Sequence, residues 1–125
     1  MIENEIRKIA SSFEGLYYVD SEDSGEGILF SIGVSFLDTI TFDKADYLNW
    51  ETLLESIDIF RPNFQIYCSY DKSGYDYWSN IMEESNYTFI NIWISSDFSD
   101  EDFNSLWREI GKIYNKLDDF NTYHK

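Results

Sequence analysis

Residues 28–36 read Ile-Leu-Phe-Ser-Ile-Gly-Val-Ser-Phe, a stretch in which large apolar and small residues alternate. Every second position is large and apolar: Ile28, Phe30, Ile32, Val34 and Phe36. The positions between them hold Ser or Gly, with Leu29 as the exception. A period of two is typical of a β-strand that buries one face and leaves the other toward solvent. The stretch therefore predicts a strand with one buried face.

Four other stretches have strand character, namely residues 16–19, 39–42, 64–70 and 87–95. Their β-branched and aromatic residues favour extended structure. Residues 87–95 differ from the rest because isoleucines occupy one face while Phe89 occupies the other together with Trp93. A strand that is apolar on both faces is expected at the centre of its sheet.

Residues 75–82 allow two interpretations. As a strand, the segment would pair with residues 87–95 across a short polar turn, forming a hairpin. As a helix, Trp78, Ile81 and Met82 would share one face. The tyrosine and tryptophan residues at the start of the segment favour the strand.

Three helices are predicted from apolar residues at helical spacing. The first covers residues 2–13, and the second runs from Asp46 or Asn49 to about Ile59. The third begins after Ser99, which is followed by three acids that suit the positive end of a helix. Helices that alternate with antiparallel hairpins indicate an α+β fold. We expect a single domain over 1–125, with a mainly antiparallel sheet of about five or six strands flanked by three helices.

The chain carries a formal net charge of −15, with 24 acids and 9 bases in 125 residues. The charge is concentrated: residues 14–60 hold eleven acids and one base, and residues 71–102 hold eight acids and one base. A field of this size attracts cationic partners and speeds their arrival. It repels nucleic acid and anionic membrane surfaces, so we expect neither as a partner.

The sequence also bears on where the protein works. Residues 1–6 carry two glutamates where a secretion signal would carry lysines, and no apolar segment of signal length follows. The single cysteine suits a reducing compartment. We therefore expect a cytoplasmic protein.

Little in the sequence points to catalysis, a metal or a cofactor. The one histidine is His124, and Cys68 lies in a strand pattern where it is expected as a small core residue. Residues 20–25 match the first half of a calcium loop, but Ser31 stands where the loop needs a bidentate glutamate. Glycine-rich phosphate loops do not occur. We expect no enzyme activity, no metal site and no cofactor.

The remaining functional signal is the interleaving of acids with aromatic residues in two clusters. The candidate partner-binding residues are Asp20, Glu22 and Asp23 in the first cluster and Asp71, Tyr75, Asp76, Tyr77, Trp78, Glu83 and Glu84 in the second. Tyr and Trp dominate the binding energy of many interfaces, and carboxylates pair with Arg or Lys. The alternative is that the aromatic residues fill the core and the acids keep the protein soluble.

In these features the chain resembles the immunity proteins that protect bacteria from contact-dependent growth-inhibition toxins and polymorphic toxins. The resemblance lies in general character: a small, acidic, aromatic-rich α+β domain without catalytic motifs. It implies an inhibitor that binds and neutralises a cationic toxin domain, such as a nuclease, and it assigns no role to any residue. Two alternatives stay open, a phage-type DNA mimic that inhibits restriction or CRISPR systems and a small ligand-binding domain or enzyme. The sequence leaves the oligomeric state open.

Overall fold

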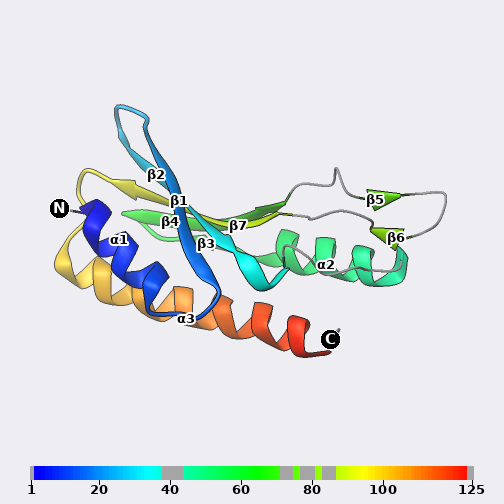
Figure 1. Ribbon diagram of the computed structural model, residues 1–125. Coiled ribbons are helices and arrows are strands. Elements are labelled where there is room, and N and C mark those ends of the chain that lie inside the picture. Colours follow the sequence, from blue (N-terminus) through cyan, green and yellow to red (C-terminus); the bar gives the residue numbers. More distant parts are fainter. Residues whose placement is uncertain (1, 38–43, 71–74, 77–80, 83–86, 124–125) are drawn as a thin grey trace.

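The structure, a computed structural model, describes residues 2–37, 44–70, 75–76, 81–82 and 87–123. These residues form an α+β fold in which a five-stranded antiparallel sheet packs against three helices (Figure 1). The predicted fold class is confirmed.

The five strands lie in an order that differs from their order along the chain. Across the sheet they are β1 (Leu16–Asp23), β2 (Gly27–Val34), β7 (Thr88–Ser95), β4 (Phe64–Tyr70) and β3 (Asp58–Phe60). Every neighbouring pair is antiparallel. β7 occupies the centre, as its two apolar faces predicted, and β1 and β3 form the edges.

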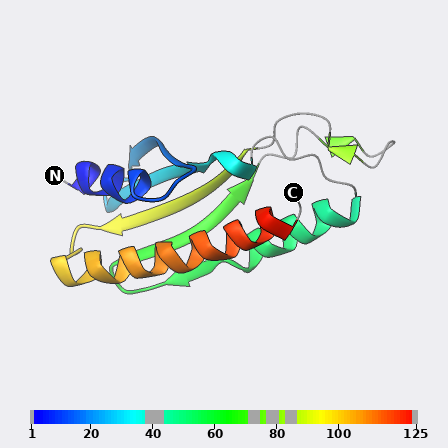
Figure 2. The same cartoon turned by 60° about the horizontal axis from the view of Figure 1, so that its bottom comes forward.

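The helices are α1 (Ile2–Ser11), α2 (Lys44–Ser56) and α3 (Asp100–Tyr123), with a 3₁₀ turn η1 (Ser35–Leu37) after β2. All three α-helices cover the same face of the sheet, and the long α3 lies across it (Figure 2). The isoleucines of β7 point toward the helices, where they are buried with apolar residues from every helix. Burial of this shared apolar surface stabilises the fold, at roughly 25 cal/mol per Å².

Polar contacts also connect the helices to this face. Trp50 of α2 donates its indole N–H to Thr88 Oγ1 of β7 over 3.2 Å, and both residues are fully buried. On the other side of the sheet's centre, Tyr18 of β1 donates its hydroxyl to Glu3 of α1 over 3.3 Å. These bonds fix the helices in register with the strands beneath them.

The second helix differs from its prediction at both ends. It starts at Lys44, before the expected Asp46, and ends at Ser56, three residues before the expected Ile59. Residues 58–60 instead form β3, where Ile59 pairs with Ile66 of β4. A strand places Ile59 toward the core without a further helical turn, and so satisfies the same apolar pattern. The predicted strand at 39–42 lies outside the described residues.

Residues 75–82 contain two short strands, β5 (Tyr75–Asp76) and β6 (Ile81–Met82), which pair with each other. The strand interpretation is therefore correct for these four residues, and the helix is wrong for them. The expected hairpin with residues 87–95 is also wrong. β7 has no edge left for another strand, because β2 pairs along one side of it and β4 along the other.

The N-terminus of α3 confirms the predicted cap. The backbone N–H of Ser99 donates to Asp102 Oδ2 over 2.9 Å, and the N–H of Asp102 donates back to Ser99 Oγ over 3.4 Å. This reciprocal arrangement satisfies amides that a helix start leaves without intrahelical partners. Among the helices of the described residues, none combines the length and the apolar character needed to cross a bilayer.

Candidate binding face of the sheet

The face of the sheet opposite the helices is the candidate site, and we name it the open face. The strand register places these residues on it: Tyr17, Asp20 and Glu22 from β1; Leu29, Ser31 and Gly33 from β2; Asp58 and Phe60 from β3; Gln65, Tyr67 and Ser69 from β4; Phe89, Asn91 and Trp93 from β7. Within the described part of the chain, no helix lies over this face (Figures 1 and 2).

Large exposed hydrophobic side chains gather on and around the open face. Among the described residues, five of the six such side chains are Tyr17, Val19, Phe60, Tyr67 and Tyr87, and the sixth is Leu48 on α2. Phe60 is 71% exposed and Tyr67 is 39% exposed. Tyr87, just before β7, stacks on Phe89 with ring centroids 6.4 Å apart. A concentration of exposed apolar surface on one face is typical of an interaction site.

A β-bulge at Val19 determines which side chains of β1 reach the open face. Tyr18 pairs with Ile32, but the next paired residue is Asp20, which lies opposite Ser31. Val19 is therefore the extra residue, and the side chains after it point to the face opposite to the one that strict alternation predicts. Strict alternation from Leu16 would have turned Asp20 and Glu22 toward the helices. The bulge turns both carboxylates toward the open face instead.

The bases are distributed unequally between the two layers of the molecule. The open face carries the carboxylates of Asp20, Glu22 and Asp58, and the sequences of the five strands contain no Lys, Arg or His. The helices carry most of the bases of the described residues: Arg7 and Lys8 in α1, Lys44 in α2, and Arg108, Lys112 and Lys116 in α3. The helices hold eleven acids and six bases, so their charges partly cancel, whereas no base of the sheet itself neutralises the carboxylates of the open face.

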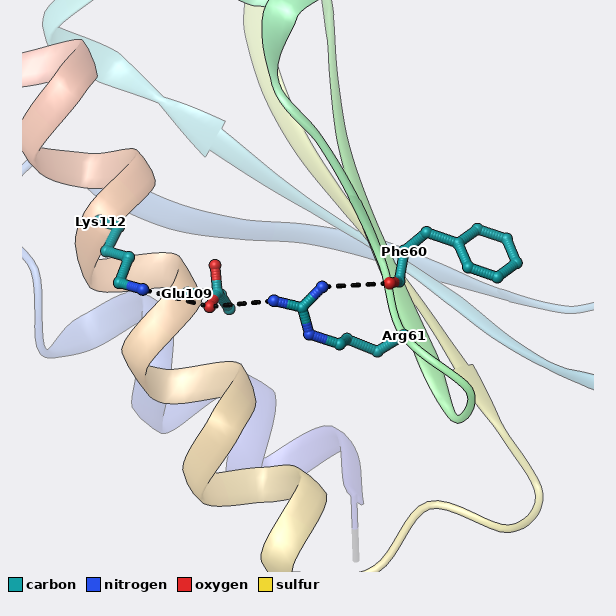
Figure 3. Close-up of polar contacts among 4 residues, drawn as sticks. All are labelled: Phe60, Arg61, Glu109 and Lys112. Carbon is teal, nitrogen blue, oxygen red and sulfur yellow. Dashed lines mark hydrogen bonds and ion pairs between the residues drawn. The ribbon is translucent and has the colours of Figure 1, made fainter.

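The remaining base of the described residues, Arg61, follows β3 but is directed away from the open face. Its guanidinium lies 3.5 Å from Glu109 Oε1 on α3, and the same oxygen lies 3.5 Å from Lys112 Nζ. Figure 3 shows this arrangement, with the ring of Phe60 pointing away from α3 while Arg61 reaches toward it. The ion pairs hold Arg61 on the helix side, so consecutive residues present an aromatic ring to one side and a cation to the other.

A polar cluster lies at the centre of the open face. Ser31 donates its hydroxyl to Asn91 Oδ1 over 3.1 Å, and Asn91 Nδ2 donates to Ser69 Oγ over 2.9 Å. Asn91 is only 7% exposed. The cluster borders a hollow of about 240 Å³ whose lining also includes Val19, Asp20 and Phe89. Polar groups therefore line a recess within an otherwise aromatic surface.

The two predicted acidic clusters have different positions. In the first, Asp20 and Glu22 lie on the open face, whereas Asp23 pairs with Ile28 and faces the helix side. The Asp23 carboxylate accepts the N–H of Gly25 over 2.8 Å and so shapes the hairpin tip. In the second, Tyr75 and Asp76 belong to β5, outside the five-stranded sheet. The other members of the second cluster, Asp71, Tyr77, Trp78, Glu83 and Glu84, lie outside the described residues.

Sequence reasoning missed several residues of the open face. The sequence places Asp58 at a helix end and assigns no role to Phe60, Tyr67, Ser69 or Asn91. The sequence does contain a signal for them, because each alternates along its strand with apolar residues that are buried or partly buried. Alternation in the sequence shows that each strand has two different faces. Only the three-dimensional structure shows that, among the described residues, no helix covers one of them.

The groups considered for nucleophilic or metal chemistry lie elsewhere. Cys68 faces the helices, and burial raises the pKa of its thiol to about 12. A thiol with so high a pKa is a poor nucleophile at neutral pH. His124 lies outside the described residues. Within the ranges that the structure describes, no three His, Cys, Asp or Glu side chains gather closely enough to hold a metal.

Comparison of the chain with protein-family models, with curated proteins and with solved structures finds no match. The functional interpretation therefore depends on the geometry and charge of the open face.

Proposed function

We propose that this protein is an inhibitor of the immunity type, which binds a cationic bacterial toxin domain with the open face of its sheet. The observation that carries the proposal is the coincidence, on one uncovered face, of exposed aromatic rings and carboxylates without a base in any of the strands. Aromatic residues supply contact energy, and the carboxylates supply attraction to Arg and Lys on the partner. A toxin that acts inside the cell requires a cytoplasmic inhibitor, so we propose that location as well.

The charge of the protein supports a fast encounter. The chain carries a net charge of −15, and the carboxylates of the open face have no neutralising base among the five strands. A cationic partner is attracted by this charge, and association steered in this way is faster than neutral docking. An inhibitor benefits from this because it must capture the toxin before damage occurs.

The two alternative functions have less support from the geometry. A DNA mimic needs carboxylates arrayed like successive phosphates. On the open face, Asp20 and Asp58 occupy opposite ends of one cross-strand row, with Ser31, Asn91 and Tyr67 between them. Mixed polar and aromatic spacing of this kind suits a protein surface better than a regular anionic backbone. A nucleophilic enzyme would need a more acidic thiol than Cys68 provides.

The proposal is tested by co-expression with the products of the neighbouring genes. We expect one neighbour to encode a basic domain that is toxic alone, is harmless with this protein, and forms a complex with it in size-exclusion chromatography. Binding of nucleic acid in place of a protein would indicate a basic surface, which neither a DNA mimic nor the proposed inhibitor has, and would contradict the proposal. So would neighbours that are neither toxic nor bound, or a protein that forms only complexes with its own copies.

Variants locate the interface once a partner is in hand. We expect Phe60→Ala with Tyr67→Ala to weaken binding at least about tenfold, the loss of a contact worth ~1.4 kcal/mol. Leu48→Ala on α2 removes an exposed apolar side chain from the opposite layer and should leave affinity unchanged. Asp20→Asn with Glu22→Gln should slow association at low salt. Glu101→Gln with Asp119→Asn, which removes two charges from α3, should slow it much less.

A further inference from the structure

We propose that the hollow at the centre of the open face is a receptor for one arginine side chain of the partner. The inference rests on the proposed function for its setting, because the partner protein supplies the arginine. The lining of the hollow comes from four neighbouring strands and consists of Val19, Asp20, Ser31, Ser69, Phe89 and Asn91. The hollow therefore belongs to the rigid part of the fold and not to a single loop.

The hydrogen-bonding groups of the hollow are matched to a donor-only ligand. The hydroxyl of Ser31 donates to Asn91 Oδ1, so the lone pairs of Ser31 Oγ are not used in this bond. Ser69 Oγ accepts one bond from Asn91 Nδ2 and has a second lone pair. Asp20 adds a carboxylate with two acceptor oxygens. A guanidinium group has five N–H donors and no acceptor, so it complements such a set.

The shape and charge of the hollow favour arginine over lysine. Phe89 provides a wall on which a flat guanidinium can stack, and such cation–π contact adds to the attraction of the carboxylate. An ammonium group has three donors around a point and makes no planar contact. A volume of about 240 Å³ leaves room for the planar head group, and Asp20 stands at the exposed rim where a cation would enter.

The bulge at Val19 contributes directly to this site. It places Asp20 opposite Ser31, next to Asn91 on the far side of β2. Asn91 is held by two serine hydroxyls and is nine-tenths buried, so its amide is fixed before any ligand arrives. A pre-ordered polar base lowers the entropic cost of fixing a ligand group.

The test uses blocked arginine (N-acetyl-arginine N-methylamide) titrated into ¹⁵N-labelled protein, followed by NMR. We expect saturable shifts confined to the amides of the hollow and to the side-chain amide of Asn91, with a dissociation constant on the order of 1 mM. Blocked citrulline, which has the same shape without the charge, should bind at least about tenfold more weakly. Blocked lysine should bind more weakly than arginine.

Variants separate this site from general attraction to an acidic protein. Asp20→Asn should weaken arginine binding at least about tenfold, whereas Asp119→Asn, which removes the same charge from α3, should not. Phe89→Leu keeps an apolar wall without an aromatic ring and should reduce the preference for arginine over lysine. The dispersion of each variant's spectrum verifies folding.

The inference is overturned if shifts spread over the acidic surface in general, if citrulline binds as well as arginine, or if the two aspartate variants behave alike. The probe is independent of the toxin, so the two proposals fail separately. Arginine binding without a toxic neighbour would contradict the proposed function alone, and a toxin complex without arginine binding would contradict this inference alone.

Discussion

The backbone of Gly27 at the start of β2 approaches Ile94 on β7 so closely that a Cβ at residue 27 would lie 2.4 Å from the carbonyl oxygen of Ile94. The indole ring of Trp93 covers the same position, 2.9 Å from that Cβ. Gly33, farther along β2, is covered in a similar way by the ring of Tyr17. Two glycines of β2 thus allow aromatic rings to lie flat against the sheet on its open face.

We predict that Gly27→Ala lowers the free energy of unfolding by about 1–3 kcal/mol, because the neighbouring backbone cannot move aside. Gly33→Ala should cost less, since the added methyl meets the ring of Tyr17, which can rotate outward. Urea denaturation monitored by circular dichroism measures both. Gly111→Ala in α3 is the control: its Cβ would meet Phe13 at an ordinary 3.8 Å, and it should raise stability by about 0.5–1 kcal/mol. Equal stability of the Gly27 and Gly33 variants would contradict the prediction.

The hydrogen bond between Trp50 and Thr88 should matter more than its single contact suggests. Thr88→Val keeps the shape of the side chain but removes this acceptor of the buried indole N–H, and we expect a loss of about 1–3 kcal/mol. Thr88→Ser keeps the hydroxyl and loses only a methyl group, so its cost should be smaller and of packing origin. Thermal denaturation of the two variants distinguishes them. A serine variant less stable than the valine variant would show that the hydrogen bond is not the dominant contribution.

The cap of α3 predicts a pH dependence of stability. Hydrogen bonds from the Ser99 backbone N–H and from Asn63 hold the pKa of Asp102 below its ordinary value of 3.8. A carboxyl group with a lowered folded pKa stabilises the protein above its unfolded pKa, and this contribution is lost as the pH falls through the folded value. Asp102→Asn should therefore lower stability at pH 7, by about 1 kcal/mol, and the difference from the wild type should shrink below pH 3.8.

Glu101→Gln is the matched control for this prediction, because it removes an exposed charge from the same helical turn without removing the cap. Its effect at pH 7 should be smaller than that of Asp102→Asn. Equilibrium urea unfolding at several pH values measures both variants. A constant difference between Asp102→Asn and the wild type from neutral to acidic pH would contradict the assigned titration.

Cys68 should be unreactive in the folded protein. Burial raises the pKa of its thiol from 9.0 to about 12, which lowers the thiolate fraction near pH 8 by roughly a thousandfold. We expect slow labelling by a thiol-specific disulfide reagent at pH 8 and rapid labelling after denaturation. A cysteine introduced at Ser96, an exposed position, provides the control for ordinary reactivity. Rapid labelling of Cys68 in the native protein would show that the thiol is more accessible than its position indicates.

Much of the fold could be predicted from local patterns. The alternation of residues 28–36 identified a strand with one buried face, although the strand ends at Val34 and a 3₁₀ turn follows it. The apolar character of both faces of residues 87–95 identified the central strand. Asp58 to Phe60 could not be separated from the preceding helix, because Ile57 and Ile59 fit the apolar face of either element. The partner strand that selects between them, β4, lies on the far side of Pro62.

The candidate site was harder to predict than the fold. Asp20 and Glu22 were identified from composition, but their direction depends on the extra residue at Val19, which alternation alone does not reveal. Only the assembled sheet brings Phe60, Tyr67 and Asn91 to one face, because they belong to three different strands. Their positions in the sequence do not indicate this. An acid-rich segment can also have a local structural role. Asp23 accepts a hydrogen bond within the hairpin tip and does not lie on the open face.

The two outer strands determine how the sheet ends. β3 has only three residues, and β1 is interrupted by the bulge at Val19 and carries Asp20, Glu22 and Asp23. A second chain adding edge to edge would meet an irregular ladder and a row of like charges, both of which oppose fibril growth. The segment most prone to amyloid-like stacking, the isoleucine-rich β7, is enclosed between β2 and β4. Unfolding would have to strip a neighbouring strand from β7 before aggregation could begin there.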